Sequence, residues 1–135
     1  MCVIMDTGPW VALVDRSESR HGECVEWLKQ FEGEIFTSEA VLTEVLYLLN
    51  FSSKAQFAAF DFILTGAIVL VPSSIESLKM AKRLMEKYQD LPMDFADATL
   101  VSLAHDLSID HIVTFDKKDF GIYRLHKKRS FIVVP

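Results

Sequence analysis

The sequence predicts an α/β protein, a three-layer α/β/α sandwich built around a mainly parallel sheet. Short apolar runs of strand length alternate along the chain with longer segments whose apolar residues recur at helical spacing. The chain has 135 residues, of which 50% are hydrophobic, and it shows no internal repeat or linker. We therefore expect one domain over residues 1–135. Right-handed crossovers between parallel strands would place helices on both faces of the sheet.

The strands are predicted from apolar runs that end at a polar or turn residue. The first run ends at Asp6, and Pro9 then suits the first turn of a helix. A continuous apolar run ends at Pro72, and another ends at Asp116. The segment after Asp116 is expected to form a turn. The expected strands are residues 2–5, 34–37, 67–71, 111–115 and 131–134, the last as an edge or final strand.

The helices are predicted from apolar stripes and from capping residues. Ser38 is expected to cap a helix that runs through Asn50, and Ser73 or Ser74 is expected to cap a second helix. Asp94 is expected to cap a third, which runs to about Leu107. The residues expected to face inward are Cys24, Val25, Leu28 and Phe31; Val41, Leu42, Val45, Leu46, Leu48 and Leu49; Phe57, Ala58, Phe60 and Leu64; and Ile75, Leu78, Ala81, Leu84 and Met85.

The charge of the whole molecule, formally −5, does not by itself indicate nucleic-acid binding. The C-terminal span differs, because six of the 14 basic residues lie between positions 117 and 129, where Asp119 is the only acid. Such a run is compatible with a solvated face and with a phosphate-contacting patch. The six residues are Lys117, Lys118, Arg124, Lys127, Lys128 and Arg129.

The cysteines and the apolar segments indicate a cytoplasmic protein without a membrane segment. Cys2 and Cys24 form no C-x-x-C pair, so neither a disulfide framework nor a zinc site is expected. Asp6 interrupts the first apolar run before it could serve as a signal peptide. The most apolar window, residues 55–71, contains Gln56 and Asp61 and is not expected to span a membrane.

Four acids from distant segments are expected to meet at one edge of the sheet. Asp6 and Asp116 follow the first and fourth strands, and the carboxyl ends of parallel strands share an edge. Glu44 and Asp97 lie in the first two turns of helices that begin at this edge. Asp97 also aligns with small apolar residues of its helix, and burying a carboxylate is costly unless a partner meets it.

Converging carboxylates repel one another and raise each other's pKa. A divalent cation would remove this repulsion. Oxygen ligands without Cys or His at ligand spacing favour Mg²⁺ or Mn²⁺ over Zn²⁺. Such an ion suits phosphodiester hydrolysis, because it can bind a phosphate oxygen and activate water.

Each acid also has a purely structural interpretation, because turns and caps use the same residue types. Asp6 could close its strand in an Asx-turn, Glu44 could be an ordinary helix acid, and Asp97 could complement the helix dipole. Asp116 could be a turn residue. Joint placement at one edge is what favours the functional interpretation. The residues expected to support the ligands are Asp94, mainly a helix cap, and Thr7 and Thr114, whose hydroxyls could orient ligands or water.

A further signal lies in four short stretches of the sequence. These are MDTGPWVAL at 5–13, TSEAVLTEV at 37–45, FADA at 95–98, and VTFD at 113–116 with Asp119-Phe120 after it. In their order and spacing, over nearly the whole chain, they resemble the PIN domain, and especially the small VapC-like single-domain proteins.

The resemblance implies a Rossmann-like α/β/α fold and a Mg²⁺- or Mn²⁺-dependent ribonuclease. Asp6, Glu44, Asp97 and Asp116 match the family's acidic positions one for one. The resemblance also implies a homodimer and, for a VapC-type toxin, a small antitoxin protein that holds it inactive. Gly8 stands where many relatives have Ser, which removes one polar contact near Asp6.

From both arguments we expect Asp6, Asp97 and Asp116 to hold the metal, with Glu44 bound directly or through water. A water would attack the RNA phosphate in line, with one acid accepting its proton, and the basic C-terminal residues would hold the RNA backbone. One alternative is a non-catalytic PIN-fold interaction module with a structural divalent ion. Another is a phosphotransfer enzyme with Asp6 as nucleophile, but Gly8 stands where a haloacid-dehalogenase-type phosphatase needs a second Asp.

Overall fold

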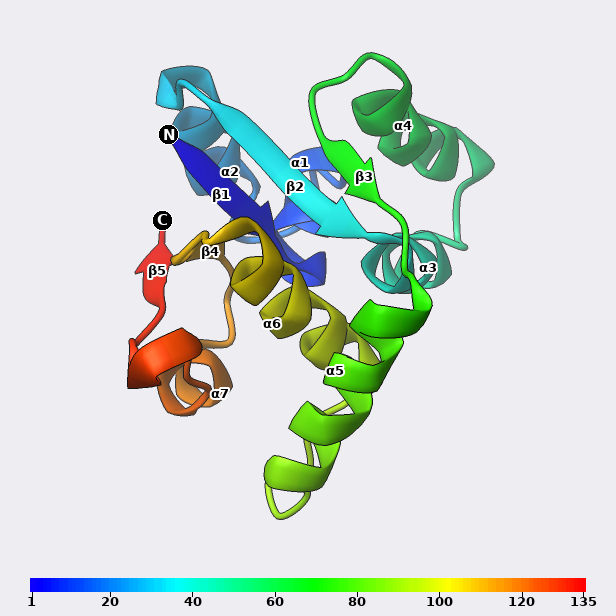
Figure 1. The fold of residues 1–135 in the computed structure, drawn as a ribbon. Helices are drawn as coiled ribbons and strands as arrows, with labels where there is room; N and C mark the ends of the chain where they lie inside the picture. Colours follow the sequence, from blue (N-terminus) through cyan, green and yellow to red (C-terminus); the bar gives the residue numbers. More distant parts are fainter.

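The sheet has five strands in the order β3-β2-β1-β4-β5, and every neighbouring pair is parallel (Figure 1). The structure, a computed structural model, describes residues 1–135. It confirms the predicted α/β class, the parallel sheet and the edge position of the last strand. The strands are β1 (Cys2–Met5), β2 (Glu34–Ser38), β3 (Val69–Val71), β4 (His111–Val113) and β5 (Ile132–Val134).

Helices cover the sheet on both sides. In Figure 1, α5 and α6 pack together in front of the sheet, whereas α1 and α2 lie behind it, and α1 also packs on α3 and α4. None of the helices combines the length and the apolar character needed to span a membrane. The helices are α1 (Thr7–Val14), α2 (His21–Gln30), α3 (Glu39–Leu48), α4 (Ser53–Leu64), α5 (Ile75–Lys87), α6 (Phe95–Leu107), α7 (Lys117–Ile122) and the short 3₁₀ helix η1 (His126–Lys128).

β1 is the central strand, and its residues are apolar because both faces of the sheet are covered there. Val3, Ile4 and Met5 are all buried. Just beyond the strand, the backbone N–H of Asp6 donates to the carbonyl of Val113 at 2.9 Å. This bond holds the carboxyl ends of β1 and β4 side by side, so the residues that follow the two strands emerge together.

The predicted helix caps are present. The side chains of Ser38, Ser74 and Asp94 accept hydrogen bonds from backbone N–H groups in the first turns of α3, α5 and α6. These bonds satisfy donors that have no partner inside the helix. They also fix where α3 and α6 begin, which is at the edge of the sheet that Asp6 leaves.

The predicted inward face of α4 was wrong. Phe57, Phe60 and Leu64 are exposed, whereas Ala59 is fully buried. The helix is apolar over most of its circumference, so its sequence does not fix which side packs against the protein. The inward positions predicted for Leu48 in α3 and for Ile75 and Leu78 in α5 were also wrong, because these side chains are exposed.

Some predicted boundaries also differ from the structure. β4 ends at Val113 instead of residue 115, and β3 begins at Val69 instead of residue 67. The expected turn after Asp116 is the start of the short helix α7. Asp116 is its N-cap residue, and a capping Asp followed by one helical turn is difficult to distinguish in sequence from an isolated turn.

Two leucines on neighbouring helices test the buried and exposed faces. Leu100 in α6 is fully buried, whereas Leu48 in α3 is 50% exposed. We expect Leu100→Ala to lower the free energy of unfolding by about 2–5 kcal/mol, because it removes buried methylenes and leaves a cavity. Leu48→Ala should change it by less than about 1 kcal/mol. Urea unfolding followed by circular dichroism measures both; equal losses would contradict this assignment of the core.

Candidate active site

Asp6 is held at the end of β1 by two neutral donors. Its Oδ1 accepts from the backbone N–H of Thr7 at 2.8 Å, and its Oδ2 accepts from the Thr114 hydroxyl at 2.6 Å. Thr114 follows β4, and its Oγ1 also accepts from the backbone N–H of Asp116 at 3.0 Å. One buried hydroxyl therefore connects the acid after β1 to the acid after β4.

Glu44 reaches the same edge from the second turn of α3. The Thr7 hydroxyl lies 3.4 Å from its Oε2, which links Glu44 to the segment that carries Asp6. The start of α3 is fixed by Ser38, whose hydroxyl accepts from the backbone N–H of Val41 at 3.3 Å.

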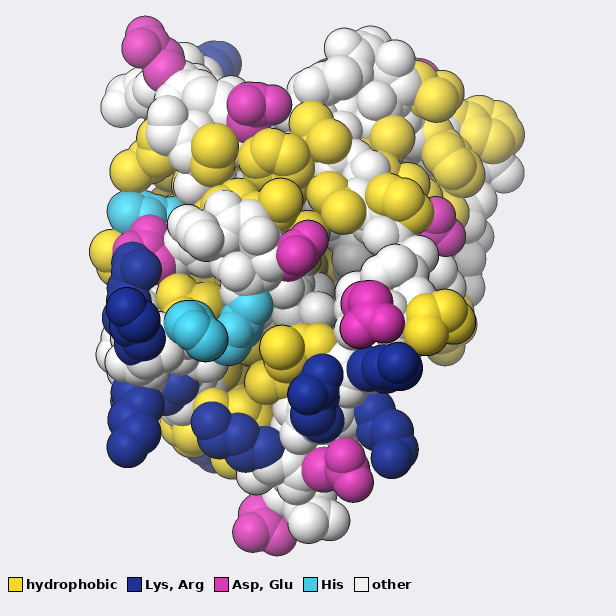
Figure 2. Space-filling model, viewed as in Figure 1, with side chains coloured by type: hydrophobic (Ala, Val, Ile, Leu, Met, Phe, Trp, Pro, Cys, Tyr) yellow, Lys and Arg dark blue, Asp and Glu magenta, His cyan; other side chains and the backbone are white.

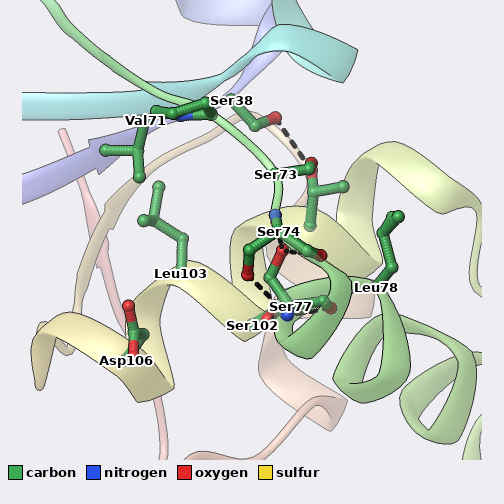
Figure 3. Close-up of a pocket in the computed structure, with 11 residues that line it drawn as sticks. Ser38, Val71, Ser73, Ser74, Ser77, Leu78, Ser102, Leu103 and Asp106 are labelled. Atoms are coloured by element: carbon green, nitrogen blue, oxygen red, sulfur yellow. Dashed lines mark hydrogen bonds between the residues drawn. The ribbon is translucent and has the colours of Figure 1, made fainter.

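Ser38 also ties α3 to α6. Its hydroxyl lies 2.8 Å from that of Thr99, which donates to the Ala96 carbonyl at 2.6 Å, so Ser38 is the donor of the bond between them. Figure 3 shows Ser38 at the wall of a cavity of about 70 Å³, lined largely by hydroxyl groups, between β3, α5 and α6. None of the four predicted acids lines this cavity. The hydrogen bond between Ser38 and Thr99 fixes the relative position of α3 and α6, the two helices that carry Glu44 and Asp97.

Asp97 lies in the first turn of α6. Its backbone N–H donates to the capping Asp94 at 2.8 Å, and its Oδ2 accepts from the Tyr123 hydroxyl at 2.8 Å. Val101 and Ala104, which share its helix stripe, are both buried. The predicted orientation of Asp97 away from open solvent is therefore correct.

Asp97 meets Asp116 and a residue that the sequence analysis did not select, Asp119. One carboxylate oxygen from each of the three lies within 4.8 Å of the others; we call this group the carboxylate triplet. Asp119 reaches it because α7 begins at Asp116, whose Oδ1 accepts from the Asp119 backbone N–H at 3.0 Å. The spacing of Asp116 and Asp119 could have indicated this pair. It does so only if a helix begins at Asp116, because the first helical turn directs both side chains the same way.

Asp6 and Glu44 border the triplet. Neither belongs to the group of oxygens within 4.8 Å, but the negative charges of Asp6 and Asp116 act on Asp97, and that of Asp6 acts on Glu44. The negative charge of Asp94 acts on Asp6, Glu44 and Asp97. The four predicted acids are thus brought to one edge, with Asp94 among them.

Burial and mutual repulsion raise the pKa of several of these carboxyl groups. Burial, with the charges of Asp94, Asp6 and Asp116, raises the pKa of Asp97 to about 7, against the opposing hydrogen bond from Tyr123. The pKa of Asp6 is also raised, chiefly by burial. The hydrogen bonds from Thr114 and Thr7 partly oppose this increase.

The pKa values of Glu44 and Asp119 are raised for the same reasons. The pKa of Glu44 is raised by burial and by Asp94 and Asp6, and that of Asp119 by burial and by Asp116. Burial and the neighbouring Asp97 also raise the pKa of Tyr123, so its phenol keeps the proton that it donates.

No lysine or arginine forms a salt bridge with any of these acids; the salt bridges of the protein involve Glu23, Glu76 and Asp110. No ion pair therefore offsets the repulsion within the acidic site; the charge of Lys118 acts on Asp119, but burial and Asp116 outweigh it and the pKa of Asp119 stays raised. Carboxylate oxygens in this number fit a hard divalent cation such as Mg²⁺ or Mn²⁺. The residues that could hold such a cation are those of the triplet, with Asp6 and Glu44 near it.

The six basic C-terminal residues are distributed over α7, η1 and the residues that follow each of them. Lys117 and Lys118 open α7 at the acidic edge. Arg129 instead bonds Asp110, which precedes β4, with 2.7 Å between Nη2 and Oδ2. Arg124 donates to backbone carbonyls at the end of α7, and η1 carries the remaining two lysines. Figure 2, viewed as Figure 1, shows Lys and Arg side chains gathered over the lower part of the molecule, which includes α5 and η1.

Gly8 leaves room for an aromatic ring next to the site. A Cβ atom on Gly8 would lie 2.8 Å from Cδ2 of Phe115, closer than two carbon atoms pack. The Arg20 guanidinium stacks on the same ring, 3.9 Å from its centroid. A serine at this position would require the Phe115 ring to move, so glycine here goes with the close packing of Phe115.

The fold and the acids together define a class: α/β proteins that gather carboxylates at the carboxyl ends of parallel strands. Within that class, the sequence model of the PIN domain family matches residues 3–126. This chain belongs to the PIN domain family.

The most informative relatives are VapC proteins. The chain is 28% identical over 135 residues to Ribonuclease VapC26 of Mycobacterium tuberculosis, covering 98% of this chain and all of that protein. The crystal structure of Mycobacterium tuberculosis VapC20, described as a Sarcin-Ricin loop cleaving toxin, superposes with a TM-score of 0.79 at 23% identity, covering 86% of this chain and 91% of that one. VapBC2 from Rickettsia felis, solved bound to a DNA fragment from its promoter, gives a TM-score of 0.69 at 17% identity over the full length of both chains.

The raised pKa of Asp97 predicts how pH affects the stability of the metal-free protein. Its pKa is about 7 in the folded protein and near its ordinary value of 3.8 when unfolded. The folded state therefore holds the extra proton between these values, and stability falls as the pH rises through this window. We expect Asp97→Asn to raise the unfolding free energy by about 1–2 kcal/mol near pH 8 after allowance for solvent screening.

Near pH 4.5 the same substitution should have little effect, because folded Asp97 is then protonated. Urea unfolding in EDTA at the two pH values measures the difference. Equal effects of Asp97→Asn at both pH values would show that Asp97 is not in a repulsive environment.

Proposed function

We propose that this protein is an endoribonuclease that depends on Mg²⁺ or Mn²⁺ and acts as the toxin of a type II toxin–antitoxin pair. The observation that carries the proposal is the carboxylate triplet at the carboxyl end of the sheet, whose members form no salt bridge. Membership of the PIN domain family and the full-length similarity to a VapC ribonuclease support the same activity.

In this proposal Asp97, Asp116 and Asp119 hold the cation, with Asp6 contributing from the end of β1. When bound, Mg²⁺ or Mn²⁺ supplies positive charge that offsets the carboxylates and polarises a phosphate oxygen and a water molecule. Thr114 keeps Asp6 and the backbone of Asp116 in fixed relation through its two hydrogen bonds. The chain thereby presents oxygen ligands that need little rearrangement.

Glu44 is the carboxylate that we assign to proton transfer. It lies at the border of the acidic site, and its one hydrogen bond, from Thr7, is long at 3.4 Å. Burial and the charges of Asp94 and Asp6 raise its pKa above the ordinary value for glutamate, which makes its carboxylate a better proton acceptor. Glu44 would accept the proton of the water that attacks the phosphate in line.

A toxin role implies an antitoxin, and α3 and α4 expose an apolar surface on which a protein partner could pack. In Figure 2 hydrophobic side chains are visible at the end of the molecule that carries α4. The exposed fractions are 72% for Tyr47, 66% for Phe51, 64% for Phe57 and 76% for Leu64. We propose that a small antitoxin covers this surface, and that the protein forms a homodimer in the cytoplasm.

The same surface favours one second candidate, a non-catalytic interaction module whose acids bind only a structural ion. Both candidates bind a protein partner, so partner binding does not separate them. Cleavage does, because only the nuclease needs the carboxylates for turnover.

The first test is cleavage of mixed single-stranded RNA by purified protein freed of co-purifying proteins. We expect cleavage with Mg²⁺ or Mn²⁺, none in EDTA, and a loss of at least about 100-fold in Asp97→Asn, because that variant removes a charged ligand of the cation. Asp106→Asn is the matched control. Asp106 is an exposed acid on the same helix, roughly 13 Å farther along its axis.

Asp106→Asn should cleave like the parent protein. Absence of metal-dependent cleavage from well-folded protein, or equal loss in both variants, would reject the proposed role of the acidic site. Retained partner binding without cleavage would favour the interaction module.

The basic C-terminal residues are tested by charge reversal. We expect Lys117→Glu with Lys118→Glu, and separately Lys127→Glu with Lys128→Glu, to weaken RNA binding without loss of fold. Two lost phosphate contacts should lower the slope of log affinity against log salt by about 1.4 for single-stranded RNA. Filter binding of uncleaved RNA in EDTA across a salt series measures this. An unchanged slope would remove that pair from the RNA-binding surface.

A further inference from the structure

Tyr123 is a fully buried residue whose hydroxyl points at the acidic site. It is the C-cap residue of α7, and its hydroxyl donates to Oδ2 of Asp97 at 2.8 Å. The bond spans 26 positions in sequence and joins α7 to the first turn of α6. The two elements that contribute the carboxylate triplet are therefore connected through one phenol.

The Tyr123 ring is held on several sides. It packs edge-to-face on Phe120 and on Tyr88, with 5.1 Å between ring centroids in each case. Its backbone N–H donates to the carbonyl of Asp119 at 3.0 Å. A buried ring with these neighbours cannot turn its hydroxyl elsewhere without disturbing the packing. The donor is thus fixed before any ligand binds.

Asp97 depends on this donor, because no other hydrogen bond reaches its carboxylate. The charged groups that act on it are Asp94, Asp6 and Asp116, all negative. Without the phenol, repulsion would favour rotamers that turn the Asp97 carboxylate away from the other acids. The bond occupies Oδ2 and leaves Oδ1 without a protein partner.

We propose that Tyr123 is a positioning residue that holds the Asp97 carboxylate in the orientation that binds the divalent cation. The inference rests on the proposed function, since it assumes that the triplet is a cation site. Tyr123 would not touch the cation or the RNA. Its effect would pass through Asp97, as is common for groups that orient metal ligands through hydrogen bonds.

Tyr88 offers a matched control. Its ring packs on that of Tyr123, and its hydroxyl is hydrogen-bonded too, accepting from the backbone N–H of Arg124 at 3.0 Å, but it forms no hydrogen bond with an acid of the site. Tyr123→Phe and Tyr88→Phe each remove one buried hydroxyl and keep the ring. The two variants differ in whether that hydroxyl reaches Asp97.

The experiment is calorimetric titration of the metal-free full-length chain with MnCl₂, with the melting temperature of each variant measured in EDTA. We expect Tyr123→Phe to bind Mn²⁺ about 10–100-fold more weakly than the parent, and Tyr88→Phe to bind within about twofold of it. Saturating Mn²⁺ should return the RNA cleavage rate of Tyr123→Phe to near that of the parent. A purely structural role predicts lower melting temperatures in both variants and equal Mn²⁺ affinities.

Equal Mn²⁺ affinity of the parent and Tyr123→Phe would overturn the positioning role and leave the proposed function intact. A parent protein that binds no Mn²⁺ would overturn both. If Tyr123→Phe is too unstable to titrate in plain buffer, the titrations of all three proteins are repeated in sucrose, which favours the folded state. Affinity of Tyr123→Phe equal to the parent under those conditions would reject the proposal, and weakened affinity with Tyr88→Phe unchanged would support it.

Discussion

Like-charge repulsion at the carboxyl end of the sheet is the constraint on which the arrangement of this protein depends. Carboxyl groups just after β1, in α3, in α6 and after β4 lie close enough to act on one another. Such a site opposes folding, because charged groups lose hydration while gaining like-charged neighbours. The chain tolerates this cost through a core in which α6 is buried along most of its length.

The acids are oriented by neutral donors instead of cations. Backbone N–H groups and the hydroxyls of Thr7, Thr114 and Tyr123 reach Asp6, Glu44 and Asp97, while the salt bridges of the protein lie elsewhere. Neutral donors fix the geometry of a carboxylate without neutralising it. The negative charge stays available for an external cation, which is the property that a divalent metal site needs.

The sequence predicted the parts of the site that depend on position along a strand or on helix phase. Asp6 follows a recognisable strand, and the stripe of small residues that buries Asp97 has clear helical spacing. Asp119 was not selected, because its role depends on a six-residue helix that resembles a turn in sequence. The sequence could not indicate Tyr123 for a different reason. Its hydrogen bond to Asp97 joins residues 26 positions apart, and no local pattern predicts such a contact. The exposed aromatic side chains of α4 were misassigned because a helix that is apolar on most sides has no clear phase.

We propose that Asp97, Asp116 and Asp119 form one site for a divalent cation. The most direct measurement is an anomalous difference map from crystals of the full chain grown with MnCl₂. We expect a manganese peak bounded by one carboxylate oxygen from each of these three residues. Manganese bound elsewhere while the three carboxylates stay free, or carboxylates that point apart in the crystal, would contradict it.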